Sequence, residues 1–420
     1  MRQWSDIIVA VVLLGAGLAV WAVWPKTSQP GSPAAAPATA RTPAPATTAT
    51  RPAQAPIGAL WPVCRGDQAA SGLASGDIPD APELLWKFAT GGPVRSTPAV
   101  ADGRAFFGSN DGNVYAVDLA TGAKLWAFTT GDAVESSPCV VGNRVFVGSS
   151  DQSLYCLDAR SGRRKWQYKT GGKIMGGVTF FVDKEASTRP ATASAPAGDL
   201  AGVRVVVGSY DNKLHCVDAV SGEAIWTYET GSYINGAPAI AGGRCVFGGC
   251  DNLLHAVSLS GHKLAGVDTG SQIPSTPALW GGLAFAGNYD NRVVCVDLET
   301  GAIRWRREVK SPFFSSPATD GRRVVIGCRD KYLYCLDAAD GTVRWRFAAG
   351  DAIDGSPVIC GGKVVFGGDD GRLRLLRLAD GGEIWKGELD DAVKGAPAVA
   401  GGLVLIGCED GKVYAFGARN

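Results

Sequence analysis

Short apolar runs alternate with polar turn sequences along most of the chain, and this pattern defines the fold class. From residue 105 to residue 128 the sequence contains an apolar run, an Asn-Asp-Gly turn, an alternating run ending at Asp118, a Thr-Gly turn and a run around Trp126. Apolar and polar positions alternate with the period of two that a β-strand requires, and a turn follows about every eight to twelve residues. The pattern therefore predicts an all-β protein.

The aspartate of the Asn-Asp-Gly turn marks a sequence repeat. Equivalent residues stand 40 positions apart, except for one spacing of 60 and one of 39. The long spacing contains an insertion of low complexity, residues 183–202. The eight marker residues are Asp111, Asp151, Asp211, Asp251, Asp290, Asp330, Asp370 and Asp410.

Each copy predicts four short strands, which fits one blade of a β-propeller. A single blade cannot bury both of its faces, so neighbouring blades must stack on it until the ring closes. The eighth copy ends at Gly417 without a fourth strand, whereas residues 83–88 precede the first copy and contain Trp86. We therefore expect this N-terminal strand to complete the eighth blade, because closure removes two open sheet edges.

A tryptophan recurs in the fourth strand of the copies and carries a family resemblance. Residues 116–126 read AVDLATGAKLW, which resembles the tryptophan-docking pattern AxDxxTGxxxW of the PQQ-like propellers, and the segment WPVCRG at 61–66 is similar to the WPxxRG lead-in of such proteins. The resemblance implies an eight-bladed propeller in which these tryptophans pack between blades. Ala265 replaces the tryptophan in one copy, and the expected docking residues are Trp86, Trp126, Trp166, Trp226, Trp305, Trp345 and Trp385.

The resemblance implies two classes of function on one fold. Quinoprotein dehydrogenases of this family bind a quinone and calcium, whereas BamB-like envelope propellers have no catalytic site and present loops to partner proteins. The blades here are short, and no set of nucleophile, base and orienting residue stands out. We therefore expect a non-catalytic interaction scaffold without a cofactor, in envelope or outer-membrane protein assembly. The alternative is a quinoprotein-type oxidoreductase or a ligand-sensing propeller.

The N-terminal region precedes the repeats and is predicted to hold the domain at a membrane. Residues 7–24 are 18 uncharged, mostly apolar positions, about long enough to span the hydrocarbon core once with the N-terminus in the cytoplasm. Residues 25–60 are rich in Pro, Ala and Thr and predict a disordered linker, and residues 61–82 lead into the propeller at 83–420. The propeller would then lie in the periplasm or otherwise outside the cytoplasm. A signal peptide cleaved near Ala22 is the alternative.

Charge and composition limit the partners. The 41 basic residues balance 40 acidic ones for a net charge of +1, so nucleic acid is not an expected partner. Only three histidines are present, which leaves little material for a histidine-based metal site. The marker aspartates are expected to bond their own turns. The chain has 11 cysteines, and disulfides are not expected. Cys156, Cys216, Cys295 and Cys335 stand at the same third-strand position, one per blade, and should act as small buried hydrophobes. The expected partners are envelope proteins and, through residues 7–24, the membrane.

Function is expected where the repeats differ. Three positions before the first-strand proline, in the loop that enters the innermost strand, the copies carry different side chains, whereas the flanking positions are uniform. These side chains should surround one mouth of the central channel, where they either bind a partner protein or form ion pairs with one another. The eight candidate residues are Arg95, Glu135, Met175, Asn235, Pro274, Phe314, Asp354 and Lys394.

Overall fold

The computed structural model describes residues 61–183 and 200–419, which belong to one compact unit. The predicted membrane segment 7–24, the linker 25–60 and most of the insertion 183–202 lie outside the described residues. No helix in the described ranges is long and apolar enough to cross a membrane. The secondary structure of these ranges consists of 33 strands joined by turns and loops.

Eight sheets follow one another along the chain, and each is one blade. Blades 1 to 4 consist of β3 (Ala99–Ala101), β4 (Arg104–Gly108), β5 (Asn113–Asp118) and β6 (Lys124–Thr129); β7 (Cys139–Val141), β8 (Arg144–Ser149), β9 (Ser153–Asp158) and β10 (Arg164–Lys169); β11 (Thr179–Val182), β12 (Val203–Gly208), β13 (Lys213–Asp218) and β14 (Ala224–Glu229); and β15 (Ala239–Ala241), β16 (Arg244–Gly248), β17 (Leu253–Ser258) and β18 (Lys263–Asp268).

Blades 5 to 8 have the same order, with the innermost strand first. They consist of β19 (Ala278–Trp280), β20 (Leu283–Gly287), β21 (Arg292–Asp297) and β22 (Ile303–Glu308); β23 (Ala318–Thr319), β24 (Arg323–Gly327), β25 (Tyr332–Asp337) and β26 (Val343–Ala348); β27 (Val358–Cys360), β28 (Lys363–Gly367), β29 (Arg372–Arg377) and β30 (Glu383–Glu388); and β31 (Ala398–Ala400), β32 (Leu403–Gly407), β33 (Lys412–Gly417) and β2 (Glu83–Ala89).

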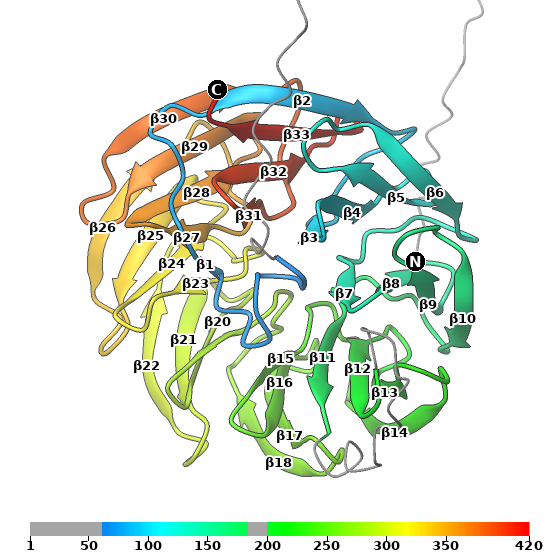
Figure 1. Ribbon diagram of the computed structural model, residues 1–420. Helices are drawn as coiled ribbons and strands as arrows, with labels where there is room; N and C mark the ends of the chain where they lie inside the picture. Colours follow the sequence, from blue (N-terminus) through cyan, green and yellow to red (C-terminus); the bar gives the residue numbers. More distant parts are fainter. Residues whose placement is uncertain (1–60, 184–199, 420) are drawn as a thin grey trace, which may run out of the picture. The chain divides into compact units, whose positions relative to one another are not determined.

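Ring closure joins the two ends of the propeller. Strand β2 pairs antiparallel with β33, with Glu83 opposite Gly417 and Ala89 opposite Lys412. Figure 1 shows these two strands side by side at the edge of the ring, although their sequences lie more than 300 residues apart. The predicted eight-bladed architecture and its closure by the N-terminal strand are confirmed.

A glycine lies at or next to the end of the second strand of each blade because the neighbouring blade lies against it. A Cβ atom at Gly148 would stand 2.1 Å from a methyl carbon of Ile174, in the loop that enters the next blade. Real Cβ atoms do not approach a carbon so closely, so any larger residue would push the blades apart. The repeated glycine is thus explained by close packing between blades.

Most of the repeated tryptophans connect one blade to the next. The indole N–H of Trp86 donates to the carbonyl of Leu119 at 3.0 Å, and five other indoles make the equivalent bond to the blade that follows. Trp385 differs from these six tryptophans. Its indole N–H meets no acceptor among the described residues, and its ring packs edge-on against Phe416 at 5.5 Å.

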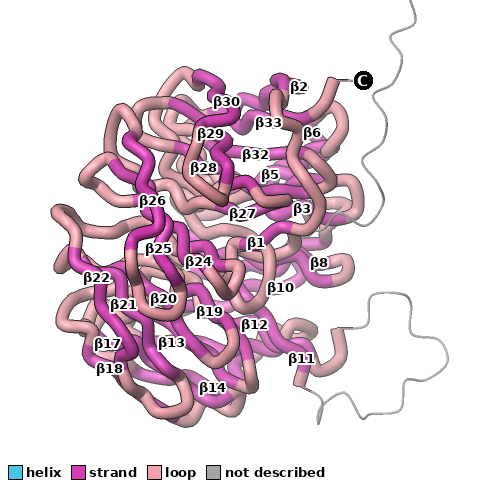
Figure 2. The backbone as a smooth tube through the Cα atoms, turned by 90° about the vertical axis from the view of Figure 1, so that its left-hand side faces the viewer, coloured by secondary structure: helices cyan, strands magenta, loops and turns pink. Residues whose placement is uncertain are grey.

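The lead-in segment occupies the centre of the ring, a role that its sequence did not predict. It follows the exposed edges of the innermost strands, where the backbone N–H groups of Val140, Leu279 and Ile359 donate to its carbonyl oxygens at 2.7 to 2.9 Å. Strand β1 (Leu73–Ala74) pairs parallel with β27 and adds a fifth strand to blade 7. The segment is drawn in blue at the centre of Figure 1, and the stacked blades are seen from the side in Figure 2. The segment therefore lines the inner edge of the ring.

Candidate functional site

One end of the ring carries a cavity, here called the mouth, of about 360 Å³. The loops that carry the eight predicted residues run from the outer strand of one blade to the inner strand of the next. Seven of the eight side chains line the cavity: Arg95, Glu135, Met175, Asn235, Pro274, Phe314 and Lys394. Asp354 does not line it but lies beneath the rim, in contact with Lys394 and Arg329, and its side chain is only 9% exposed.

A second set of variable residues contacts the first set and was missed from the sequence. These residues directly precede the marker aspartates. Six of them contact the predicted mouth residue 25 positions later in the chain, and Glu409 contacts Arg95 where the ring closes. Asn110 donates to Glu135 at 3.2 Å, Arg329 binds Asp354, and Tyr289 packs on Phe314. The full set is Asn110, Ser150, Tyr210, Cys250, Tyr289, Arg329, Asp369 and Glu409. Its variation between copies, as great as that of the first set, is the signal that could have identified it.

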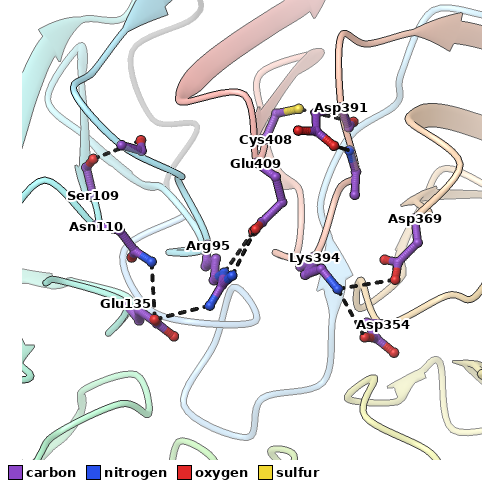
Figure 3. Close-up of polar contacts among 12 residues, drawn as sticks. Arg95, Ser109, Asn110, Glu135, Asp354, Asp369, Asp391, Lys394, Cys408 and Glu409 are labelled. Atoms are coloured by element: carbon purple, nitrogen blue, oxygen red, sulfur yellow. Dashed lines mark hydrogen bonds and ion pairs between the residues drawn. The ribbon is translucent and has the colours of Figure 1, made fainter. Parts of the chain in front are cut away.

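Charged side chains form an arc over blades 1, 2, 6, 7 and 8. Figure 3 shows Arg95, Glu135, Asp354, Asp369, Lys394 and Glu409 of this arc. Arg95 binds Glu409 at 2.8 Å and Glu135 at 3.3 Å. Lys394 binds Asp369 at 3.3 Å and lies 3.7 Å from Asp354. The ion pairing expected between Arg95 and Glu135 is present, but the shorter contact of Arg95 is with Glu409.

The pKa values in this arc follow from the pairing. The hydrogen bond to Glu409 raises the pKa of Arg95 above its usual range, so this side chain keeps its charge. Burial raises the pKa of Asp369, and the neighbouring Asp354 carboxylate adds to this effect while Lys394 opposes it. Two carboxylates thus share one lysine, and the charged arc is close to balanced within itself.

Aromatic side chains form the opposite arc of the mouth, over blades 3 to 5. The rings of Tyr210 and Tyr233 are stacked with their centroids 4.9 Å apart, and Tyr289 lies 4.8 Å from Phe314. The guanidinium carbon of Arg329 stands 3.7 Å above the Phe314 ring and joins the aromatic arc to the charged one. Half of Tyr233 is exposed. Large, ordered aromatic rings beside solvent are typical of the central residues of protein interfaces.

The lead-in segment forms the floor of the mouth through Cys64 and Arg65. The Arg65 side chain is 1% exposed, and its Nη2 donates to the carbonyl oxygens of Pro317 at 3.0 Å and Pro357 at 2.6 Å. Burial lowers the pKa of Arg65 to about 10, and burial raises the pKa of the Cys64 thiol. At neutral pH the floor therefore carries a guanidinium cation and an uncharged thiol.

The marker aspartates bond within and between the blades. The Asp111 carboxylate accepts bonds from the backbone N–H groups of Gly91 and Asn113 at 2.7 and 2.9 Å and from the Tyr115 hydroxyl at 2.6 Å. Burial raises the pKa of Asp111, but these hydrogen bonds outweigh it and lower the value. In blades 3 and 4, histidine replaces the tyrosine, as in the contact of His215 with Asp211 at 3.0 Å. These residues stabilise turns.

The mouth residues do not fit a quinone with calcium. Calcium prefers several carboxylate oxygens directed at one point. Here Glu135 and Asp354 are each in an ion pair with an arginine or lysine, and Asn235 accepts a bond from the Tyr210 hydroxyl. Among residues 61–183 and 200–419, no three histidine, cysteine, aspartate or glutamate side chains are grouped to hold a metal ion. All 11 cysteines are free thiols, and nine of them are buried.

The chain matches a family model described as outer membrane protein assembly factor BamB. The matched ranges are 79–188, 183–265 and 251–420, so they cover the whole propeller. A search of curated proteins gave no match.

Many solved structures share the fold at low sequence identity. BamB from Moraxella catarrhalis is 17% identical with a TM-score of 0.66 and covers 80% of this chain and 100% of its own. A quinohemoprotein alcohol dehydrogenase from Comamonas testosteroni is 14% identical, with a TM-score of 0.72 and coverage of 88% and 82%. A europium-containing methanol dehydrogenase is 12% identical, with a TM-score of 0.70 and coverage of 86% and 98%. At these identities the likeness shows the fold alone.

Proposed function

The chain belongs to the family of outer membrane protein assembly factor BamB, and on this premise we propose that it is a non-catalytic scaffold that binds other envelope proteins through the mouth of its propeller. The structural relatives include a BamB protein and two dehydrogenases, so the proposal depends on the chemistry of the mouth. Assembly of outer-membrane proteins is the process that the family description suggests.

The observation that carries the proposal is the pair of arcs around the mouth. The two variable residue sets contact each other in a self-paired arrangement, which leaves an ordered aromatic surface beside an ordered charged one. Protein interfaces combine aromatic residues and arginine at the centre with polar groups at the rim. A small-molecule active site would instead direct several unpaired reactive groups at one point.

The proposal includes a tether. Residues 7–24 would cross the membrane, residues 25–60 would act as a spacer, and the propeller would face the periplasm. An alkaline wash of membranes should leave the full-length chain in the pellet. Release of a chain shortened near Ala22 would instead support a cleaved signal peptide.

Photo-crosslinking tests the mouth directly. A photoreactive amino acid at Tyr233 should give a discrete adduct with an envelope protein in cells, whereas one at Leu125, equally exposed on an outer strand, should not. Arg95→Glu should weaken the Tyr233 adduct, and the control Lys124→Glu, on an outer strand, should leave it unchanged. Equal adducts from Tyr233 and Leu125 would contradict the proposal.

The quinoprotein alternative has its own assay. The purified chain, supplied with pyrroloquinoline quinone and calcium, should not reduce an acceptor dye with alcohols or sugars. Turnover that disappears in Glu135→Gln or Asp354→Asn would move the protein to the dehydrogenase class.

A further inference from the structure

A ring of hydroxyl groups lies below the two arcs, at the floor of the mouth. The members that line the cavity are Thr97, Ser137, Thr276, Ser316 and Ser356. Each stands two positions after a mouth residue, so the repeat itself places the hydroxyls around the channel axis. Four of them are buried, and Ser356 is partly exposed. Buried hydroxyls require hydrogen-bond partners, which makes their bonding informative.

Neighbouring blades use these hydroxyls as acceptors. The oxygen of Thr276 accepts the backbone N–H of Ala237 at 2.8 Å, that of Ser316 accepts the N–H of Thr276 at 3.1 Å, and that of Ser356 accepts the N–H of Ser316 at 2.9 Å. In residues 61–183 and 200–419 the protons of these three hydroxyls have no acceptor. Since each oxygen already receives a proton, each hydroxyl is left with its own proton to donate. The floor is therefore rich in donors.

The charge at the floor also favours a negatively charged ligand. Arg65 lies behind Ser316 and Ser356, bound to the carbonyls of the prolines that follow them. No carboxylate of the described chain lies within ion-pair distance of its guanidinium, and its Nε and Nη1 have no partner there. Arg95 and Lys394 also line the cavity, but carboxylates of the charged arc already pair with them, so of these three cations Arg65 is the unpaired one. A buried cation without a counter-ion favours an anion nearby.

We propose that the floor of the mouth binds one oxyanion, a carboxylate, on the hydroxyl groups of Thr276, Ser316 and Ser356 within the field of Arg65. Hydrogen bonds to an ionised acceptor are stronger than neutral ones, and hydroxyl donors from three successive blades would give the acceptor a defined position. A cavity of about 360 Å³ suits a small dicarboxylic acid or the end of a peptide chain. The site is independent of whether the rim binds a partner protein.

Calorimetric titration of the full-length chain tests this site. Succinate is added at constant ionic strength in chloride, and 1,4-butanediol, which has the same four-carbon chain without charge, is the control. We expect saturable binding of one succinate per chain and no heat from the diol. Acetyl-triglycine and its C-terminal amide then distinguish the source: tighter binding of the peptide acid than of succinate identifies a chain terminus, and the reverse identifies a free small acid.

A matched pair of variants locates the site. Ser316→Ala should weaken succinate at least about tenfold, because one charge-assisted hydrogen bond is lost. Ser315→Ala should not weaken it, since Ser315 is equally buried in the same loop but does not line the cavity. If Ser316→Ala disturbs folding, Ser356→Ala serves the same purpose.

Three results overturn the proposal: no binding of succinate, equal binding of succinate and the diol, or equal effects of Ser315→Ala and Ser316→Ala. Loss of the Tyr233 crosslink with succinate binding intact would contradict the proposed function alone.

Discussion

The body of the blades and the mouth use the same repeat in opposite ways. In the body, equivalent positions make the same contact repeatedly: an aspartate accepts from a turn, a glycine lies against the next blade, and an indole donates to the next blade. At the mouth, equivalent positions carry different side chains that pair with one another across the blades. The body therefore specifies the ring, whereas the mouth specifies what the ring can bind.

The two regions should also differ in how strongly their side chains contribute to the free energy of unfolding. Body positions are buried, so substitutions there create cavities, overpacking or unpaired charges. Mouth positions are partly exposed, and their ion pairs contribute little to stability. Substitutions in the body should lower the free energy of unfolding, and substitutions at the mouth should change binding instead.

The largest effect is expected at the closing strand. Trp86→Ala should lower the free energy of unfolding by about 3–5 kcal/mol, because it removes a buried ring and the bond to Leu119 that fastens β2. Trp385→Ala is the matched control, since that indole also packs against the core but makes no hydrogen bond to the described residues of the next blade. It should cost about 1–2 kcal/mol less. Urea unfolding measures both, and equal losses would contradict the special role of the closing strand.

Substitution of one arginine in each region compares the contributions of the two regions to stability. Arg374, in the body, is 4% exposed and binds Asp370 through Nη1 at 2.9 Å, whereas 40% of the Arg95 side chain is exposed at the mouth. Arg374→Gln should cost about 3 kcal/mol, because it removes the nearest cation from a largely buried carboxylate. Arg95→Gln should cost less than about 1 kcal/mol despite two ion pairs. A larger loss from Arg95→Gln would remove the distinction between the regions.

Two glycines separate backbone strain from packing. Gly341 and Gly301 both have positive φ, at 72° and 69°, but a Cβ at Gly341 would lie 2.5 Å from the Trp305 ring. At Gly301, where Ala265 replaces the tryptophan of the preceding blade, the nearest atom is 4.0 Å away. Both alanine substitutions carry the strain of a left-handed residue, and Gly341→Ala should cost about 1–3 kcal/mol more. Equal melting temperatures of the two variants would show that the Trp305 ring moves aside without a loss of stability.

The smallest effect is a pH dependence at one blade boundary. Tyr168 of blade 2 packs against His215 of blade 3. At the equivalent positions between blades 1 and 2, Phe128 packs against Tyr155. Burial lowers the pKa of His215 below its ordinary 6.5, although Asp211 opposes this. As the pH falls below 6.5, the unfolded histidine gains a proton before the folded one does, so stability falls.

The exchange Tyr168→Phe with His215→Tyr should remove part of that loss. Melting temperatures between pH 8 and pH 5 should fall less steeply below about pH 6.5 in the double variant than in the natural chain. The Asp211 carboxylate is retained, and its lowered pKa places its own titration below this range. Identical slopes would contradict the assignment.

The ring could be predicted from the sequence because each copy of the repeat contains its own strands and turns at fixed positions. Once Asp111 and its equivalents are aligned, the strands and turns follow, and the incomplete eighth copy requires the strand at Trp86 for closure. The same alignment placed the mouth residues in one set of loops. Trp385 shows the limit of this reasoning, since it stands at the repeated tryptophan position but its indole N–H makes no hydrogen bond to the described residues of the next blade.

Side-chain pairing at the mouth could not be predicted in the same way. Arg95 and Glu409 are 314 positions apart and meet only because the ring closes. Which carboxylate Arg95 prefers depends on the conformation of two adjoining loops, and no periodicity encodes that choice. The position of the lead-in segment was also hidden, because the partners of Arg65 are backbone carbonyls, which every residue carries.

The lead-in segment has a consequence for how the propeller unfolds. Repeat proteins gain stability from neighbour to neighbour, so a distant repeat can open while the others stay folded. Here one segment forms backbone hydrogen bonds with the inner strands of six of the eight blades, through Val100, Val140, Ile240, Leu279, Thr319 and Ile359. Each of those six blades is therefore coupled to the others through the lead-in segment as well as through its contacts with neighbouring blades. The propeller should therefore unfold cooperatively as a single unit, without stable arrays of fewer blades.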